Sequence, residues 1–313
     1  MDLELFFRSF RARADWGNRV GMRRRKAAKY AWRCLLHGRR QARWLRFLDG
    51  HPLLRRIVTV QPRLHERWHH AYVSRQLGAT RRLAVAHQHY AFLLAHWPAA
   101  AIEAIYLHEG LPLGTLELKD GSHAHLALRR PVGKGTEGEL GLYLFDDDGQ
   151  RLCSLVFTIA GDGLLIGCVQ GAYAHMGAEA ARRFTRQSHG LRPKNLLLSV
   201  LYALAAHHGM ARVRGVGNAA HPFAGQLDRE CSGPRIKTDY DAFWVECGGR
   251  RGDDGFYELP PREPLRDPNE VESKHRSAFR KREQLRRQGC HQALAALGLA
   301  APAGEDTALE AAA

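Results

Sequence analysis

Residues 141–170 read GLYLFDDDGQRLCSLVFTIAGDGLLIGCVQ, and the pattern continues with PKNLLLSVLYALAAHHG at 193–209 and VRGV at 213–216. The first stretch predicts three strands, because the turn sequences DDDG and GDG separate apolar runs of strand length. The second predicts a long helix that begins at a proline and ends before a glycine, followed by a short strand. This order predicts an α+β fold, in which a mixed, mainly antiparallel sheet packs on a central helix.

The flanking segments predict helices on both sides of this sheet. In the first 110 residues, apolar spacings of three and four indicate three or four helices, with breaks at Gly50, Pro52, Pro62 and Gly78. After the central unit we expect a strand pair at 240–247 and 256–259, and then a charged helix over 268–288 with Asp267 or Asn269 as its cap. The predicted organisation is therefore a basic helical region at 1–110, a sheet domain with a C-terminal helix at 111–290, and a flexible Ala-rich tail at 291–313.

Length and composition favour an intracellular protein with its own core. A chain of 313 residues can bury a substantial core, and its six cysteines are scattered without a C-x-x-C pair. They predict free thiols in a reducing compartment. The charged start does not resemble a secretory signal, and no run reaches the roughly 18 apolar residues of a spanning helix. We expect a cytoplasmic location, or attachment to the inner face of the membrane.

Basic charge is concentrated in the first 100 residues. They hold 21 Lys and Arg against 5 Asp and Glu, a net charge of +16, whereas the whole chain carries +15. The run RRRK at 23–26 continues to Lys29 and Arg33 on one helical face, with Tyr30 and Trp32 interleaved. This face could bind anionic lipid headgroups or nucleic-acid phosphate, or could simply be solvated. We favour an anionic membrane surface over nucleic acid, because no base-reading motif is present.

The start of the central helix is the first candidate site. Its sequence is SHGLRPKN at 188–195, and helix N-termini attract anions. Arg192, Lys194 and Asn195 could therefore bind a phosphate or carboxylate, with His189 as an acid or base beside it. The alternative is that these residues only cap the helix and keep it soluble. The absence of a G-x-S-x-G elbow argues against a hydrolase.

A second candidate site lies at the ends of predicted strands. Asp239 and Tyr240 are candidate catalytic groups there, and a carboxylate or histidine could act as a general base if burial shifts its pKa toward neutrality. Asn218, His221 and Trp244 are candidate substrate-binding residues. The alternative for the polar residues is turn chemistry.

No metal site is predicted. The histidines cluster at 69–70, 87–89 and 207–208, but adjacent histidines on a helix point about 100° apart and chelate one ion poorly. Neither an H-E-x-x-H motif nor a cysteine at ligand spacing accompanies them.

Several separated motifs carry a family resemblance. They are HQHYAFL at 87–93, SHGLRPKNLL at 188–197, GVGN at 215–218, DYDAFW at 239–244, and the basic run from Arg276 to Arg282. Over residues 40 to 290 the chain resembles the VirK/YbjX family of Gram-negative bacteria. The resemblance implies a domain of unknown function associated with virulence and with resistance to antimicrobial peptides and other envelope stress. No catalytic residues can be carried over from that family.

The three meandering strands, the helix and the next strand also resemble the central half of the GNAT acyltransferase fold. This second resemblance implies a cofactor loop at Gln170 and Gly171. A helix-like insertion at 174–187 precedes the central helix, however, and GLRPKN replaces the usual second glycine pair. The leading hypothesis is an acyltransferase acting on an envelope or lipid-linked acceptor, with acyl-CoA or an acyl carrier protein as donor. The rival hypothesis is a non-enzymatic accessory factor that binds lipid or a protein through the basic region, and nucleic-acid binding is the weakest alternative.

Overall fold

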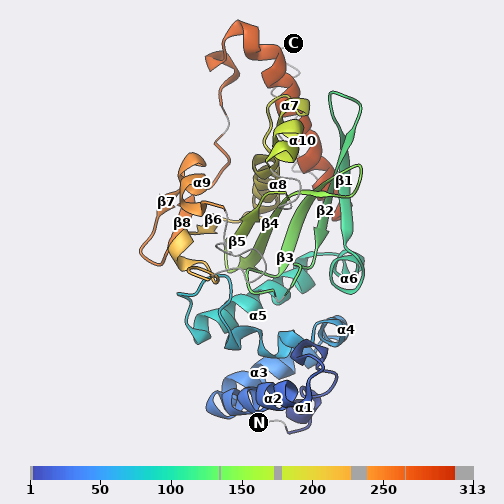
Figure 1. Ribbon diagram of the computed structural model, residues 1–313, viewed down its shortest axis with the longest axis vertical. Coiled ribbons are helices and arrows are strands. Elements are labelled where there is room, and N and C mark those ends of the chain that lie inside the picture. Colours follow the sequence, from blue (N-terminus) through green and yellow to red (C-terminus); the bar gives the residue numbers. More distant parts are fainter. Residues whose placement is uncertain (1–2, 134, 173–177, 227–237, 265, 300–313) are drawn as a thin grey trace.

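The meander predicted from residues 141–170 is confirmed in the computed structural model, which describes residues 3–133, 135–172, 178–226, 238–264 and 266–299. Its strands are β3 (Leu140–Asp146), β4 (Arg151–Ala160) and β5 (Gly163–Gln170) (Figure 1). Gly149 and Gly161 occupy the two turns with φ of 70° and 62°, a conformation that favours glycine. The turn sequences therefore determine where each strand ends.

Eight strands form one sheet in the order β1-β2-β3-β4-β5-β6-β8-β7. The remaining strands are β1 (Leu111–Glu117), β2 (His123–Arg129), β6 (Arg212–Val216), β7 (Arg250–Arg251) and β8 (Phe256–Leu259). Neighbouring strands are antiparallel except β5 and β6, which are parallel. The expected mixed, mainly antiparallel sheet is thus confirmed.

The central helix α8 (Pro193–His207) makes the parallel crossover between β5 and β6. Its residues are apolar on almost every side, because the helix packs both on β3 to β6 and on the C-terminal helix α10 (Arg276–Ala296). Gly289 of α10 permits close packing, since a Cβ there would lie 3.2 Å from Leu196 of α8. A shorter helix, α7 (Glu179–Gln187), precedes α8.

The N-terminal region contains more helices than predicted, but the expected breaks are correct. The helices are α1 (Leu3–Arg8), α2 (Val20–Leu36), α3 (Gly38–Asp49), α4 (Pro52–Val60), α5 (Ala79–His96) and α6 (Ala99–Leu107), with 3-10 turns η1 (Ala14–Trp16) and η2 (Pro62–His69). Gly50 ends α3, Pro52 begins α4 and Gly78 precedes α5. None of the helices in the described part of the chain has the length and apolar character needed to span a bilayer.

The predicted strand at 240–247 is wrong. These residues form helix α9 (Tyr240–Glu246), whose N-cap is the Asp239 side chain, which accepts a hydrogen bond from the Ala242 amide. Tyr240, Phe243 and Trp244 are buried on one side of this helix, a spacing that fits 3.6 residues per turn. The helix is only seven residues long, so its buried aromatic residues could not be distinguished from the pattern of a strand.

The C-terminal helix also differs from its predicted bounds. Asp267 caps a short 3-10 turn, η5 (Pro268–Glu270), and a second turn, η6 (Ser273–His275), comes before α10 begins. The helix then continues past residue 290 to Ala296, and both Ala293 and Leu294 are buried. Residues 291–296 of the predicted flexible tail at 291–313 are thus helical, and the part from residue 300 lies outside the described residues.

A buried ion pair joins the helical region to the sheet. Arg67 of η2 lies with its Nε 2.7 Å from Oε1 of Glu139, next to β3, and both side chains are at least 95% buried. Tyr90 of α5 donates to Glu139 Oε2 at 2.8 Å. Although burial opposes the charge, the Glu139 carboxylate raises the pKa of Arg67 above its ordinary value. The Arg67 cation is therefore stabilised inside the core.

Replacing Glu139 tests this connection. Glu139→Gln leaves the Arg67 cation buried without its counter-charge, so we expect the free energy of unfolding to fall by about 3–5 kcal/mol. Urea denaturation at neutral pH measures the change. The matched control is Glu103→Gln, which removes the partner of the exposed Arg56 and should cost less than about 1 kcal/mol. Equal losses in the two variants would contradict the role of the buried pair.

Candidate functional site

The parallel ladder between β5 and β6 stops before β5 does. Gly163 to Ile166 pair with Arg212 to Gly215, whereas β5 continues to Gln170. The chain leaving β6 enters the 3-10 turn η4 (Asn218–Ala220), and α9 packs beside β6 and β8. Side chains from η4 and α9 therefore gather beside the end of β5 that extends beyond its pairing with β6.

Two aromatic residues of α9 fill the space at this end. The Val169 amide of β5 donates to the Tyr240 hydroxyl at 3.3 Å. The Trp244 indole lies against Gly215, where a Cβ would be 2.2 Å from the ring, and its Nε1 donates to the Val216 carbonyl at 2.8 Å. Trp244 is fully buried. The predicted substrate-binding residue thus lies in the core behind the strand ends.

Asn218 and Asp239 contact each other, but as capping groups. The Asn218 amide donates to Asp239 Oδ1 at 2.8 Å, and the Tyr240 backbone amide donates to Asn218 Oδ1 at 2.8 Å. The Ala242 amide and the Asn218 side chain lower the pKa of Asp239 below its ordinary value. A carboxylate stabilised in this way is a weak base, so its geometry fits the turn chemistry that was the alternative.

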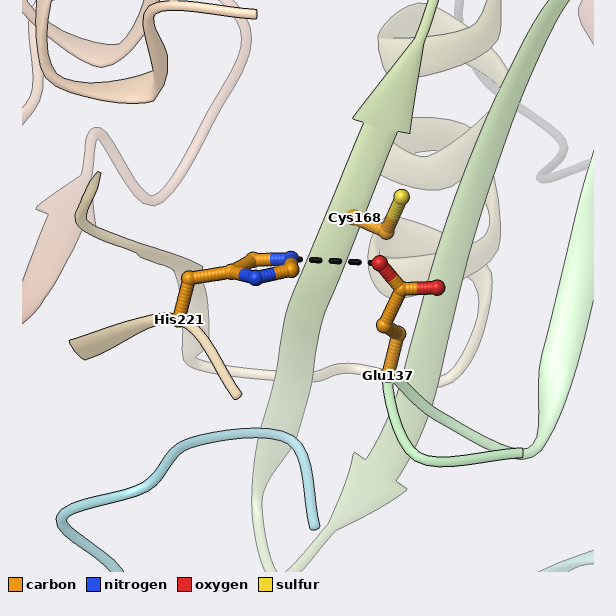
Figure 2. A group of neighbouring side chains, drawn as sticks. All are labelled: Glu137, Cys168 and His221. Carbon is orange, nitrogen blue, oxygen red and sulfur yellow. Dashed lines mark ion pairs between the residues drawn. The ribbon is translucent and has the colours of Figure 1, made fainter. Parts of the chain in front are cut away.

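Glu137, Cys168 and His221 form a compact buried cluster beside Tyr240. Their ligand atoms all lie within 4.8 Å of one another, and Figure 2 shows Glu137 and His221 approaching each other across β5 with Cys168 beside them. Cys168 and His221 are each 1% exposed, and the Glu137 side chain is 19% exposed. We call these three residues the Glu-Cys-His cluster.

The histidine of this cluster is held on one side. Nδ1 of His221 accepts a hydrogen bond from the Phe223 amide at 3.1 Å, and its ring stacks on Tyr240 with centroids 5.1 Å apart. Its Nε2 lies 3.2 Å from Glu137 Oε1, but the two atoms are not aligned for a hydrogen bond. The buried Nε2 is consequently aimed into the cluster without a hydrogen-bond partner.

Burial keeps the Cys168 thiol and the Tyr240 hydroxyl neutral. Desolvation, followed by the Glu137 carboxylate, raises the pKa of the Cys168 thiol well above its ordinary value. Desolvation, followed by Cys168, does the same for Tyr240, whose hydroxyl lies 3.5 Å from Cys168 Sγ. Cys168 is therefore a poor nucleophile in this state, because nucleophilic attack requires the thiolate.

The start of α8 has its own acidic neighbour. Glu246 of α9 forms an ion pair with Arg192, and its other oxygen lies 4.0 Å from Lys194 Nζ. Lys194 also lies over the Phe243 ring, 4.1 Å from its centroid. The carboxylate of Glu246 thus holds the two cations that were predicted to bind an anion.

The other predicted residues of the cofactor site are spread around this helix start. Gln170 pairs with Ser154 in the sheet, and Gly171 is exposed with open space around it. Asn195 is in the first turn of α8, where its carbonyl accepts from the Ser199 hydroxyl. His189 has a left-handed φ of 55°, and desolvation, followed by Lys281 and Lys119, lowers its pKa.

The structure therefore brings the second candidate site together and changes its members. Asn218 and His221 each contact Tyr240 beside the end of β5, whereas Trp244 packs against β6. Arg192 and Lys194 pair with Glu246 at the other end of α9. Sequence reasoning missed Glu137 and Cys168. Each belongs to a different segment, and no spacing in the sequence indicates that they converge on His221.

A substitution of Gly167 tests how closely the backbone at Glu137 packs on β5. A Cβ at Gly167 would lie 1.9 Å from the Glu137 carbonyl oxygen, so Gly167→Ala forces this segment to move. We expect a loss of about 1–3 kcal/mol in the free energy of unfolding.

Gly171 provides the matched control, because a Cβ there would meet nothing within 4 Å. Gly171→Ala should change stability by less than about 0.5 kcal/mol. Thermal and urea denaturation of both variants measure the difference. An unchanged stability of Gly167→Ala would show that the segment is not held against β5.

Comparison with known proteins identifies relatives without a described activity. The family model described as "Protein of unknown function (DUF535)" matches residues 19–292. A protein of Escherichia coli (strain K12) named "Uncharacterized protein YbjX" is 29% identical over 268 residues, which cover 84% of this chain and 81% of that protein. A Mannheimia haemolytica protein named "Membrane protein LapB" is 26% identical over 195 residues, which cover 61% of this chain and 82% of that protein. No solved structure matches the chain with statistical significance.

Proposed function

This chain belongs to the DUF535 family, and we propose that it acts at an anionic membrane surface, to which it binds through helices α1 and α2. The observation that carries this proposal is the exposed face of α2. Trp32, Leu35 and Leu36 are 64–67% exposed there, although their side chains are large and apolar. Exposed apolar groups that gather on one face mark an interaction site.

Two basic side chains precede two apolar ones along the same face. Counting 3.6 residues per turn, Arg25, Lys29, Trp32 and Leu36 follow one another at spacings of three and four, opposite the buried Tyr30 and Cys34. Neither Arg25 nor Lys29 makes an ion pair within the described part of the chain. A helix with this mixture lies in the membrane interface, where apolar side chains enter the acyl boundary and cations contact headgroups.

Exposed apolar side chains are concentrated on the same two helices. Among the described residues, ten large apolar side chains are exposed, and seven of them belong to α1 or α2. These seven are Leu3, Phe7, Val20, Met22, Trp32, Leu35 and Leu36. Figure 1 places both helices at one end of the long axis, away from α10, so a flat bilayer could approach them. A nucleic-acid surface would not need this apolar content, since phosphate contacts come from polar and basic groups.

A relative's name agrees with this proposal. The Mannheimia haemolytica protein, which is 26% identical over its matched part, is named a membrane protein. The roles in virulence and envelope stress that the family resemblance implies stay predictions.

Vesicle binding tests the proposal. We expect the full chain to sediment with vesicles that contain phosphatidylglycerol, and much less with pure phosphatidylcholine. Each near-surface cation contributes about 1 kcal/mol, so Arg25→Gln with Lys29→Gln should weaken binding about 30-fold. Trp32→Ser with Leu36→Ser should weaken it as well, because less apolar area is buried.

The matched control removes two exposed cations elsewhere, Arg250→Gln with Arg251→Gln of β7, and should leave vesicle binding unchanged. A salt series with duplex DNA is run in parallel. Binding to DNA but not to vesicles, or vesicle binding that the α2 variants retain, would refute the proposal.

Acyl transfer is the second candidate function, and the parallel pair of β5 and β6 favours it. The α8 crossover, and the end of β5 that extends beyond its pairing with β6, agree with the GNAT resemblance drawn from the meander. The acceptor would be a lipid-linked or envelope molecule, with acyl-CoA or an acyl carrier protein as donor. The donor's phosphate would have to displace Glu246 from Arg192 and Lys194, because the carboxylate occupies that position.

Calorimetry with acyl-CoA and with an acyl carrier protein tests this second function. If the start of α8 binds the donor, Glu246→Gln should tighten binding by freeing the two cations, and Arg192→Ala with Lys194→Ala should abolish it. The proposal of acyl transfer at this site would be refuted if donor affinity were unchanged by these substitutions, or if the donor did not bind even to Glu246→Gln.

A further inference from the structure

We propose that Glu137, Cys168 and His221 bind a zinc ion at the end of β5. Three different donor types meet there, a carboxylate, a thiol and an imidazole, with all ligand atoms within 4.8 Å of one another. Tetrahedral zinc with ordinary bond lengths places such ligand atoms about 3.3–3.6 Å apart. The 3.2 Å separation between His221 Nε2 and Glu137 Oε1 is already close to that value.

The donor set is the first argument for zinc over other cations. Sulfur and imidazole nitrogen are ligands for zinc, whereas calcium and magnesium prefer oxygen alone. Cys168 and His221 are both 1% exposed, so water reaches neither of them easily. A set of three protein ligands also leaves a fourth coordination position for water or another ligand.

The hydrogen bond that His221 Nε2 lacks is the second argument. This buried nitrogen makes no hydrogen bond, because its 3.2 Å ion-pair contact with Glu137 Oε1 is not aligned as one (Figure 2). Buried polar atoms almost always have a partner, so such an atom requires an explanation. A metal ion between Nε2, Cys168 and Glu137 supplies one.

The neighbouring residues would orient the ligands. The Tyr240 hydroxyl lies 3.5 Å from Cys168 Sγ, and it also accepts from the Val169 amide, which fixes its position. The Tyr240 ring stacks on His221 and limits how that imidazole can rotate. Gly167 allows the backbone at Glu137 to lie directly against β5.

Two protons must move when zinc binds. The Cys168 thiol gives its proton to solvent, and the sulfur lone pair forms the bond to zinc. His221 Nδ1 accepts from the Phe223 amide, so the proton of an uncharged imidazole in this orientation lies on Nε2. That proton must move to Nδ1, so zinc binding exchanges one backbone hydrogen bond for a metal bond.

Metal titration of the full chain tests this inference. The purified protein is freed of metal with a chelator and titrated with ZnCl2 against a competing zinc indicator. We expect one zinc per chain, and affinity more than about 100-fold weaker in Cys168→Ser and in His221→Ala. Loading with Co²⁺ should produce sulfur-to-cobalt charge-transfer absorption that Cys168→Ser lacks.

The controls separate this site from other thiols and histidines. Cys153→Ser changes another buried cysteine of the sheet, and His208→Ala changes a partly buried group near His96 and His207. Both should bind zinc as the wild type does. If His221→Ala fails to fold, Glu137→Gln decides, because this partly exposed residue keeps its size but loses its charge.

Three results would overturn the inference: no zinc bound by the folded wild type, binding lost in His208→Ala, or binding retained in Glu137→Gln, Cys168→Ser and His221→Ala. The site lies at the sheet, far along the chain from α2. Failure of the zinc titration would therefore leave the membrane-binding proposal untouched, and failure of the vesicle experiment would leave the zinc proposal untouched.

Discussion

The buried ion pair between Arg67 and Glu139 is the contact on which the arrangement of this protein depends. It joins a basic helical region to a sheet, and Tyr90 adds a second hydrogen bond from α5 to the same carboxylate. Neither charge could remain in the core alone, because an isolated buried ion is far more costly than a paired one. The helical region and the sheet therefore pack as one body.

The same contact positions the Glu-Cys-His cluster. Glu139 is two residues after Glu137, and Gly138 between them has a φ of 157° and no space for a Cβ, which would lie 2.8 Å from the Phe157 carbonyl oxygen. Fixing Glu139 thus fixes the direction from which Glu137 reaches β5. The proposed zinc site depends on a loop that the helical region holds in place, whereas α1 and α2 lie at the end of that region away from the sheet (Figure 1).

Local sequence signals predicted the local structure well. The turns at Gly149 and Gly161 and the helix limits at Pro193 and Gly209 have backbone requirements that only a few residue types meet, so they could be read directly. The helix α9 was misread because seven residues give too little periodicity to distinguish its buried aromatic side from an alternating strand. Glu137 and Cys168 could not be predicted as a site, because only the tertiary fold brings them to His221. The charge of the first 100 residues was visible in the sequence, but the exposure of Trp32 and Leu36 beside it was not.

Hydrogen exchange of the full chain, with and without vesicles of anionic phospholipid, tests most directly whether one end of this molecule meets the membrane. The account predicts slower exchange over residues 3–36, with the strands β3 to β6 unchanged. Unaltered exchange in α1 and α2, or protection centred on β7 or α10 instead, would contradict it.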